Sequence, residues 1–128
     1  MSVTILLIDD DRFVRNLLPL YLQREGMTVV ASADGTTGLH AIAEHHPAVV
    51  LLDIDLPDMD GWSVLRHIRA HVEYQPAVIL LTGRDDRSDR LQSRELGVSA
   101  VDYIVKPFEA ANVVARVKAV LARERSGL

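Results

Sequence analysis

The stretch AVVLLD, residues 48–53, is a run of apolar residues that ends abruptly in a carboxylate. Its apolar residues are continuous rather than alternating, which is typical of a parallel-sheet strand with both faces covered. Outward from it, short apolar runs of the same kind lie at residues 3–8, 27–31, 77–81 and 101–105. The sequence therefore predicts five short strands that pair in parallel.

Helical patterns separate these strands. One stripe at helical spacing consists of Val14, Leu17, Leu18, Tyr21 and Leu22. A stripe of the same length lies within residues 113–121, and shorter ones lie within residues 39–43 and 64–68. The charge-rich residues 85–96 predict a helix with few apolar anchors. Strands that alternate with helices predict an α/β fold, in which a doubly wound, five-stranded parallel sheet has helices on both faces.

Composition narrows the class of protein. We expect the 128 residues to form a single domain, residues 1–128, with no second domain. The absence of cysteine excludes a disulfide framework and a thiol nucleophile, and the net charge of −4 disfavours direct nucleic-acid binding. No apolar run approaches the ~18–20 residues of a membrane span, and no signal peptide is evident. We therefore expect a cytoplasmic protein that does not contact the membrane.

Polar side chains collect where the predicted strands end. They are Asp9, Asp10, Asp53, Thr82 and Lys106. Ligands of an open parallel sheet bind outside these carboxyl ends, so we expect the side chains to meet there. Clustered carboxylates repel unless a cation lies between them, and their oxygens suit Mg²⁺. A carboxylate beside a metal and a lysine can attack phosphorus, and the pattern therefore predicts phosphoryl transfer.

Several motifs in a fixed order carry a resemblance to a known family. They are IDD at residues 8–10, LLD at 51–53, LPDMDG at 56–61, LTG at 81–83 and DYIVKPF at 102–108. Together they resemble the receiver domain of two-component response regulators, over about residues 4–123. The resemblance implies a flavodoxin-like (βα)5 fold with strand order 2-1-3-4-5 and a phosphorylatable signalling switch.

The resemblance also implies how the switch is phosphorylated. Asp53 resembles the phosphoacceptor, and Asp9 and Asp10 resemble the acidic pair that holds Mg²⁺. Asp53 and the backbone carbonyl of Asp55 would be further metal ligands. The implied donor is a histidine kinase or a histidine-phosphotransfer protein, and an unidentified effector would receive the signal. The domain would not be an enzyme with a turnover substrate, because it would catalyse only its own phosphorylation and dephosphorylation.

The resemblance assigns further residues to the response. Thr82 resembles the hydroxyl that binds the phosphoryl group, and Tyr103 resembles the aromatic residue that turns inward when Thr82 moves. Lys106 would neutralise a phosphoryl oxygen, with a cis peptide bond to Pro107. The face made by the fourth helix, fifth strand and fifth helix would then change. The side chain of Asp55 occupies a place that in this family tunes the lifetime of the phosphoryl group.

A possible dimer face follows from a narrower resemblance. Residues 82–96 resemble the subfamily of winged-helix DNA-binding regulators, which dimerise through that same face. Asp102 and Arg116 match one intermolecular salt-bridge pair of the subfamily, and Arg90 matches half of another. A homodimer is therefore expected on phosphorylation. One pair is lost because Asn112 stands where a Glu is usual, four residues before Arg116, and residues 96–103 are two residues longer than is typical.

Simpler structural roles compete with function at several polar and aromatic residues. Asp11 precedes a predicted helix and is expected to be its N-cap. Asp58 and Asp60 are expected to be turn residues. Trp62 is expected to be a packing residue.

Two other functions fit parts of the pattern. Asp53-Ile54-Asp55 matches the Asp-x-Asp motif of haloacid-dehalogenase-type phosphatases, in which the first Asp is the nucleophile and the second a general acid. In that family the motif usually ends the first strand, whereas here it ends the third. An inert, receiver-like interaction module would lack a key residue, and none is missing. These comparisons favour the receiver.

Overall fold

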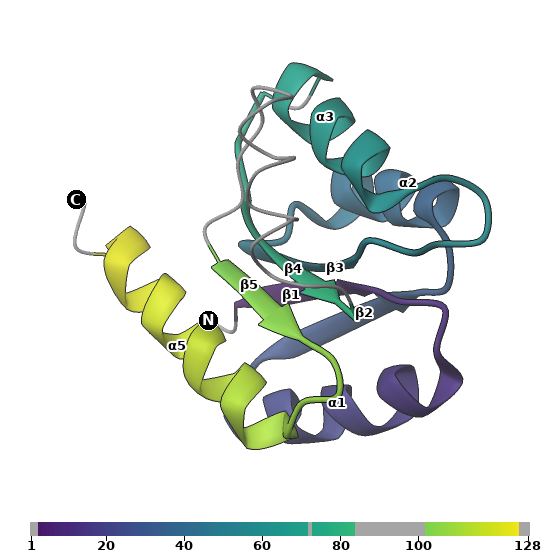
Figure 1. Cartoon of the computed structure of the whole chain (residues 1–128). Helices are drawn as coiled ribbons and strands as arrows, with labels where there is room; N and C mark the ends of the chain where they lie inside the picture. The colour runs from purple at the N-terminus through teal and green to yellow at the C-terminus, as the bar shows by residue number, and fades with distance from the viewer. Residues whose placement is uncertain (1–2, 72, 84–101, 126–128) are drawn as a thin grey trace.

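Five parallel strands form one sheet at the centre of the molecule (Figure 1). The computed structural model describes residues 3–71, 73–83 and 102–125. The strands are β1 (Thr4–Ile8), β2 (Thr28–Ser32), β3 (Val49–Asp53), β4 (Ala77–Thr82) and β5 (Asp102–Val105). Their order is β2-β1-β3-β4-β5, and each neighbouring pair is parallel. The predicted strands are confirmed to within one residue at each end, and the predicted order is also confirmed.

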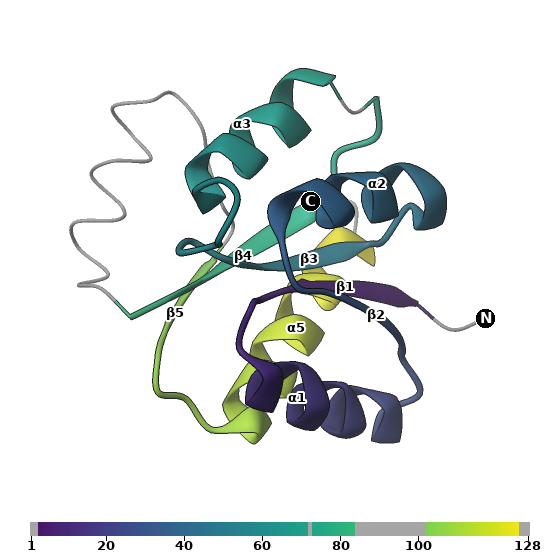
Figure 2. The same cartoon turned by 90° about the vertical axis from the view of Figure 1, so that its right-hand side faces the viewer.

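Helices cover both faces of the sheet, as the alternation of strands and helices predicts. On one face lie α1 (Arg12–Arg24) and α5 (Ala110–Arg125), and on the other lie α2 (Gly35–His45) and α3 (Gly61–His71) (Figures 1 and 2). The helix expected at residues 85–96, with Arg90 in it, lies outside the described residues, as does most of the loop before β5. None of the described helices is long and apolar enough to cross a membrane.

Each face of the sheet has its own apolar core. Leu51 of β3 belongs to the core beneath α1 and α5, whereas its neighbour Leu52 belongs to the core beneath α2 and α3. All residues of β3 and of β4 are buried for this reason. A strand that is covered on both faces needs apolar residues at every position, and this explains the continuous runs in the sequence.

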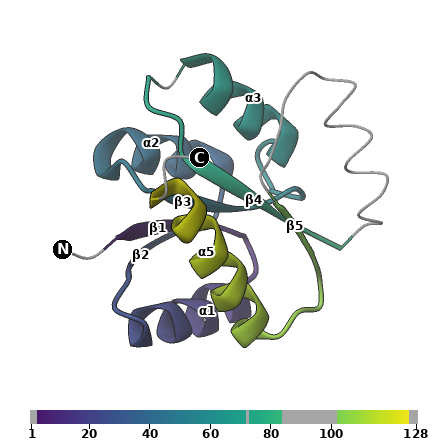
Figure 3. The same cartoon turned by 90° about the vertical axis from the view of Figure 1, so that its left-hand side faces the viewer.

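The register of the strands aligns their carboxyl ends at one edge of the sheet. Ile8 at the end of β1 pairs with Leu52, next to the last residue of β3. Asp53 pairs with Leu81, and Thr82 pairs with Val105 at the end of β5. Figure 3, taken from the side opposite to Figure 2, shows the sheet between its two helix layers. The polar residues that end or follow these strands are therefore neighbours.

Candidate functional site

Three carboxylates converge at the carboxyl edge of the sheet. Asp9 and Asp10 follow β1, and Asp53 ends β3. One oxygen from each side chain lies within 4.8 Å of the others, and this is the acidic cluster that the sequence predicts. Asp9 and Asp53 are buried and Asp10 is exposed. Two carboxylates of the cluster are therefore shielded from solvent, and the third is open to it.

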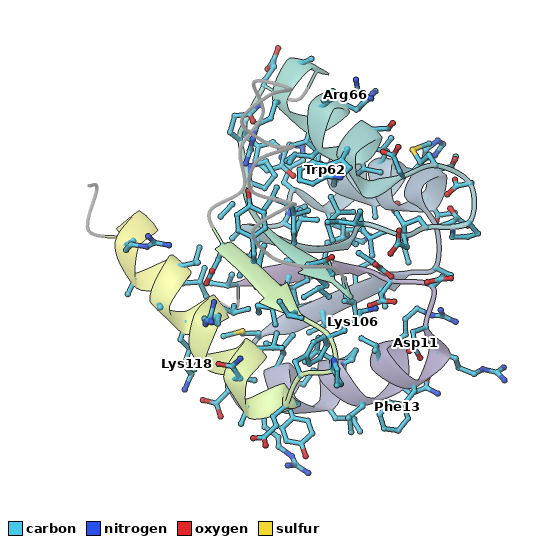
Figure 4. The ribbon with its side chains drawn as sticks, viewed as in Figure 1. Asp11, Phe13, Trp62, Arg66, Lys106 and Lys118 are labelled. Carbon is cyan, nitrogen blue, oxygen red and sulfur yellow. The ribbon has the colours of Figure 1, made fainter. Side chains whose placement is uncertain are left out.

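The ammonium group of Lys106 pairs with both buried carboxylates. Its Nζ lies 2.8 Å from Oδ2 of Asp9 and 3.2 Å from Oδ2 of Asp53. Lys106 directly follows β5, and its backbone N–H donates to the carbonyl of Thr82 at 2.6 Å. Figure 4 shows Lys106 at the same edge of the molecule as Asp11, the residue before α1. The expected cis bond between Lys106 and Pro107 is confirmed.

Burial and charge together set the protonation of these groups. Burial raises the pKa of the Asp53 carboxyl from 3.8 to about 6, and the charge of Asp9 adds to the rise. The hydrogen bond from Asp55 and the charge of Lys106 oppose it. Burial acts to lower the pKa of Lys106, but the hydrogen bond and charge of Asp9 and the charge of Asp53 outweigh it. The net shift for Lys106 is therefore upward, and the ammonium is charged at neutral pH.

The loop between β3 and α3 holds the Asp53 carboxylate on its other side. The backbone N–H of Asp55 donates to Oδ1 of Asp53 at 3.0 Å. The loop closes where Gly61 N–H donates to the carbonyl of Ile54 at 2.6 Å. A Cβ on Gly61 would lie 2.6 Å from the backbone oxygen of Asp53, so only glycine lets α3 start this close to β3. Both oxygens of Asp53 thus have a partner, one in the loop and one in Lys106.

The start of α1 fixes the backbone of the first two acidic residues. Asp11 is the N-cap of α1, and its carboxylate accepts from the N–H groups of Phe13 and Val14, which confirms the predicted cap. Asp11 also donates its own N–H to Oδ1 of Asp9 at 2.9 Å. Arg15 donates from its guanidinium to the backbone carbonyl of Asp9 at 3.1 Å. Arg15 was not predicted, because its helical position alone does not show that it folds back over the strand end.

The two residues of the predicted switch lie on neighbouring strands. Thr82 ends β4 and is fully buried beside the acidic cluster, next to the Lys106 backbone that it hydrogen-bonds. Tyr103 lies on β5, is half-buried, and packs against the core beneath α2 and α3. The sheet therefore brings Thr82 to the site, whereas Tyr103 lies farther back along β5.

Two of the predicted dimer residues, Asp102 and Arg116, form an ion pair within one chain. Arg116 of α5 lies 2.7 Å from Oδ2 of Asp102, the first residue of β5. The same guanidinium nitrogen donates to the carbonyl of Tyr103 at 3.4 Å. Both side chains of the ion pair are partly exposed. The role of Asp102 and Arg116 between two chains stays a prediction.

One polar residue has a contact that sequence reasoning missed. Asp58, expected to be a turn residue, accepts three hydrogen bonds from Gly35 and Thr36 at the start of α2. The residues are more than twenty positions apart, and no local signal joins them. The prediction that Trp62 is a packing residue is confirmed, because Trp62 is 2% exposed in the core. Asp60, also expected to be a turn residue, instead pairs with Asp55 in a β-bridge and accepts from Ser63 N–H at 2.8 Å at the start of α3.

Comparison with known proteins identifies the family that shares this sequence pattern and fold. The sequence model of the response regulator receiver domain matches residues 5–118. The chain belongs to the response regulator receiver domain family. The transcriptional regulatory protein SrrA of Staphylococcus aureus (strain NCTC 8325 / PS 47) is 40% identical to this receiver domain over 126 residues, which are 98% of this chain and 51% of SrrA. The chain thus spans about half the length of the curated relatives it matches.

Solved structures of receiver domains agree with this one. The response regulator DrrB of Thermotoga maritima, an OmpR/PhoB homologue, is 35% identical with a TM-score of 0.84 over 97% of this chain and 54% of DrrB. The BeF3-activated receiver domain of DrrB is 32% identical with a TM-score of 0.80, over 95% of this chain and 99% of that one. This receiver domain is accordingly a phosphorylatable signalling domain of the two-component systems. These relatives lend no support to the phosphatase alternative.

The acidic cluster fits the Mg²⁺ that receiver domains bind at an acidic pocket. The ligand atoms available are hard carboxylate oxygens, which Mg²⁺ prefers. Three carboxylates and the one ammonium of Lys106 leave two negative charges when all are ionised, which a divalent cation balances. The exposed side chain of Asp10 leaves the cluster open to solvent, so a cation can enter with water still bound.

Proposed function

We propose that Asp53 is the residue of this receiver domain that accepts the phosphoryl group. The observation that supports the proposal most is the position of its carboxylate, at the carboxyl edge of the sheet and 3.2 Å from the Lys106 ammonium. Asp9, Asp10 and Asp53 would hold Mg²⁺ together with the backbone carbonyl of Asp55. The bound cation would supply charge neutralisation for the phosphoryl oxygens.

The transfer itself asks for positioning and charge more than for acid–base chemistry. A bond forms between an Asp53 carboxylate oxygen and phosphorus, while the bond between phosphorus and the imidazole nitrogen of a phosphohistidine donor breaks. The electron pair of the broken bond stays with the imidazole. Lys106 would shift from the carboxylate towards a phosphoryl oxygen, and the Asp55 N–H would keep the acceptor oriented. The domain would in this way catalyse its own phosphorylation and later its own hydrolysis.

The same proposal gives Thr82 and Tyr103 the parts of a switch. A phosphoryl group on Asp53 adds negative charge and hydrogen-bond acceptors next to Thr82, which ends the neighbouring strand. The hydroxyl of Thr82 would turn towards the phosphoryl group, and the Tyr103 side chain would turn inward into the space that Thr82 vacates. The face made by the fourth helix, β5 and α5 would change and be recognised by an effector. We propose that this face then forms a homodimer through Asp102, Arg116 and Arg90.

The donor would be a histidine kinase or a histidine-phosphotransfer protein. A protein donor has to bring phosphorus to Asp53 beside Lys106, and so it must cover the surface there. That surface includes a cleft of about 320 Å³ between α1 and the segment after β5, lined by Phe13, Leu17 and Pro107 among others. Phe13 is 70% exposed, which is unusual for so large an apolar side chain. It would be an apolar anchor for the donor.

Intact mass tests the acceptor directly. The wild type, Asp53→Asn and Asp60→Asn are incubated with Mg²⁺ and acetyl phosphate. We expect one phosphoryl group on the wild type and on Asp60→Asn, a control that removes an exposed carboxylate from the same loop, and none on Asp53→Asn. Equal labelling of Asp53→Asn would show that another residue is the acceptor. An unlabelled, folded wild type that binds Mg²⁺ would instead favour an inert interaction module.

A second experiment separates donor docking from chemistry. Phe13→Ala should lower the rate of transfer from a phosphorylated histidine-phosphotransfer protein by about tenfold, as truncation of an interface anchor does. Its labelling by acetyl phosphate should match that of the wild type, because the small donor needs no docking surface. If Phe13→Ala loses both phosphotransfer and labelling by acetyl phosphate, Phe13 is needed for folding rather than for docking. If it loses neither, Phe13 is not part of the docking surface.

A further inference from the structure

The loop between β3 and α3 is fastened to the start of α2 by one side chain. Oδ1 of Asp58 accepts from the N–H of Gly35 at 2.8 Å. Oδ2 of Asp58 accepts from the N–H of Thr36 at 2.9 Å and from the Thr36 hydroxyl at 2.7 Å. The first N–H groups of a helix have no partner inside the helix. Two of those of α2 are therefore satisfied by a residue of another loop.

The helix already has a cap of its own, so Asp58 is not needed for that purpose alone. Asp34 precedes α2 and accepts from the N–H of Thr37 at 2.8 Å, as an ordinary N-cap does. The hydrogen bonds from Thr36 and Gly35 lower the pKa of Asp58 from 3.8 to about 2, so the bridge favours the ionised carboxylate. Asp34 is thus the local cap of α2, and Asp58 is a bridge from the loop to the same helix end.

A close apolar contact lies beside the bridge. A Cβ on Gly35 would lie 2.5 Å from Cγ of Met59 and 3.1 Å from a methyl of Val64. The absence of a side chain at Gly35 therefore lets Met59 sit against the helix start. Two successive residues of the loop, Asp58 by hydrogen bonds and Met59 by packing, hold the same end of α2.

The other end of the loop is fastened to β3. Asp55 donates its N–H to the Asp53 carboxylate at 3.0 Å and pairs with Asp60 in an antiparallel bridge. Gly61 donates to the carbonyl of Ile54. The segment that carries Asp55 therefore runs between an anchor on the acceptor strand and an anchor on α2.

We propose that Asp58 is a positioning residue that fixes this loop so that the Asp55 backbone carbonyl is presented to Mg²⁺. The inference rests on the proposed function, because Asp55 is a proposed metal ligand. Asp58 touches none of the carboxylates of the acidic cluster, and it acts only through the backbone. Residues that orient metal ligands from outside typically change metal affinity by about 10–100-fold when they are replaced.

Mg²⁺ affinity, measured by calorimetric titration of the unphosphorylated protein, tests the positioning role. Asp58→Asn should bind Mg²⁺ about tenfold more weakly than the wild type. Asp34→Asn is the matched control, since it removes the same charge from the same helix end but leaves the bridge to the loop. If both variants weaken binding equally, charge or helix stability explains the effect and the positioning role is wrong.

Thr36 offers a test in which the charge does not change. Thr36→Val removes the hydroxyl that donates to Asp58 and should weaken Mg²⁺ binding by about threefold, whereas Thr36→Ser keeps the hydroxyl and should restore it. The Mg²⁺ concentration for half-maximal labelling by acetyl phosphate should rise in Thr36→Val and Asp58→Asn. The labelling rate at saturating Mg²⁺ should stay that of the wild type, because the acceptor itself is intact.

The outcomes separate this inference from the proposed function. Wild type that binds Mg²⁺, with Thr36→Val and Asp58→Asn unchanged in affinity, overturns the role of Asp58 and leaves the metal site standing. Wild type that does not bind Mg²⁺ overturns the proposed metal site and the role of Asp58 together. Amide exchange of Gly35 in the metal-free protein adds a readout free of Mg²⁺. Faster exchange in Asp58→Asn than in Asp34→Asn is expected, and equal exchange counts against the bridge.

Discussion

Replacing Asp53 by Asn should stabilise the metal-free domain at neutral pH. The Asp53 carboxyl has a pKa raised from 3.8 to about 6, first because it is buried and also because Asp9 lies beside it. A raised carboxyl pKa means that the folded state disfavours the charged form more than the unfolded state does. As the pH rises from about 4 to 6, the unfolded chain releases its proton first, and the free energy of unfolding falls. Asn carries no charge and escapes this loss.

The size of the effect follows from the same shift. A rise from 3.8 to about 6 corresponds to about 3 kcal/mol in the free energy of unfolding above pH 6. The neutral amide of Asn is also desolvated, so we expect a gain of about 2–3 kcal/mol, or roughly 10 °C in Tm for a domain of this size. Mg²⁺ should narrow the difference, because a ligand at 100 times its Kd stabilises the wild type by about 2.7 kcal/mol.

Urea unfolding in EDTA between pH 4 and 8 measures this gain, followed by the fluorescence of Trp62. Asp58→Asn is the control, because the pKa of Asp58 is lowered to about 2 by its hydrogen bonds to α2. A lowered carboxyl pKa contributes stability above pH 4 that is lost as the pH falls, so this variant should be less stable at pH 7. Asp53→Asn that is no more stable than wild type at pH 7, or equally more stable at pH 4, would refute the reasoning.

Three further substitutions test other parts of the site. Gly61→Ala should lower the free energy of unfolding by about 1–3 kcal/mol, because its Cβ would lie 2.6 Å from the Asp53 backbone oxygen. Gly83→Ala is the neutral control in the same urea assay, because no atom of the described residues would lie within 4 Å of its Cβ. Asp11→Ala should cost about 1 kcal/mol in thermal unfolding, as the loss of an N-cap does, and a large loss of Mg²⁺ affinity would instead make Asp11 part of the metal site. Asp55→Ala keeps the backbone carbonyl and should change the rate at which the phosphorylated domain loses its label; an unchanged rate would rule out a role for that side chain.

The strands and the acidic edge could be predicted because each depends on local sequence and on one topological rule. Continuous apolar runs identify strands that are covered on both faces. Parallel pairing then brings the strand ends together, so Asp9, Asp53 and Lys106 could be placed in one site without any knowledge of distances. The cap at Asp11 was equally local, since an N-cap bonds residues two and three positions away.

The contacts that could not be predicted join residues that are far apart in the sequence. Their distance in space depends on how the loops and helices pack. Asp58 reaches the start of α2 across 23 positions of sequence, and its local pattern indicates only a turn. Arg116 reaches Asp102 inside the chain because α5 packs beneath β5, and a sequence match to a dimer contact cannot distinguish this from a contact between chains. Arg90 lies outside the described residues, so its part in the dimer face stays a prediction.

The ion pair between Asp102 and Arg116 constrains how two copies of the chain could associate. Each copy holds the pair internally, at 2.7 Å and partly exposed to water. A symmetric dimer that joined the same groups across its interface would exchange two internal pairs for two external ones. The exchange conserves the number of ion pairs, so it adds almost nothing to the binding energy, and exposed pairs are weak in any case. It would act on selectivity, because only a partner with both groups in the same places avoids leaving a charge without its counterion.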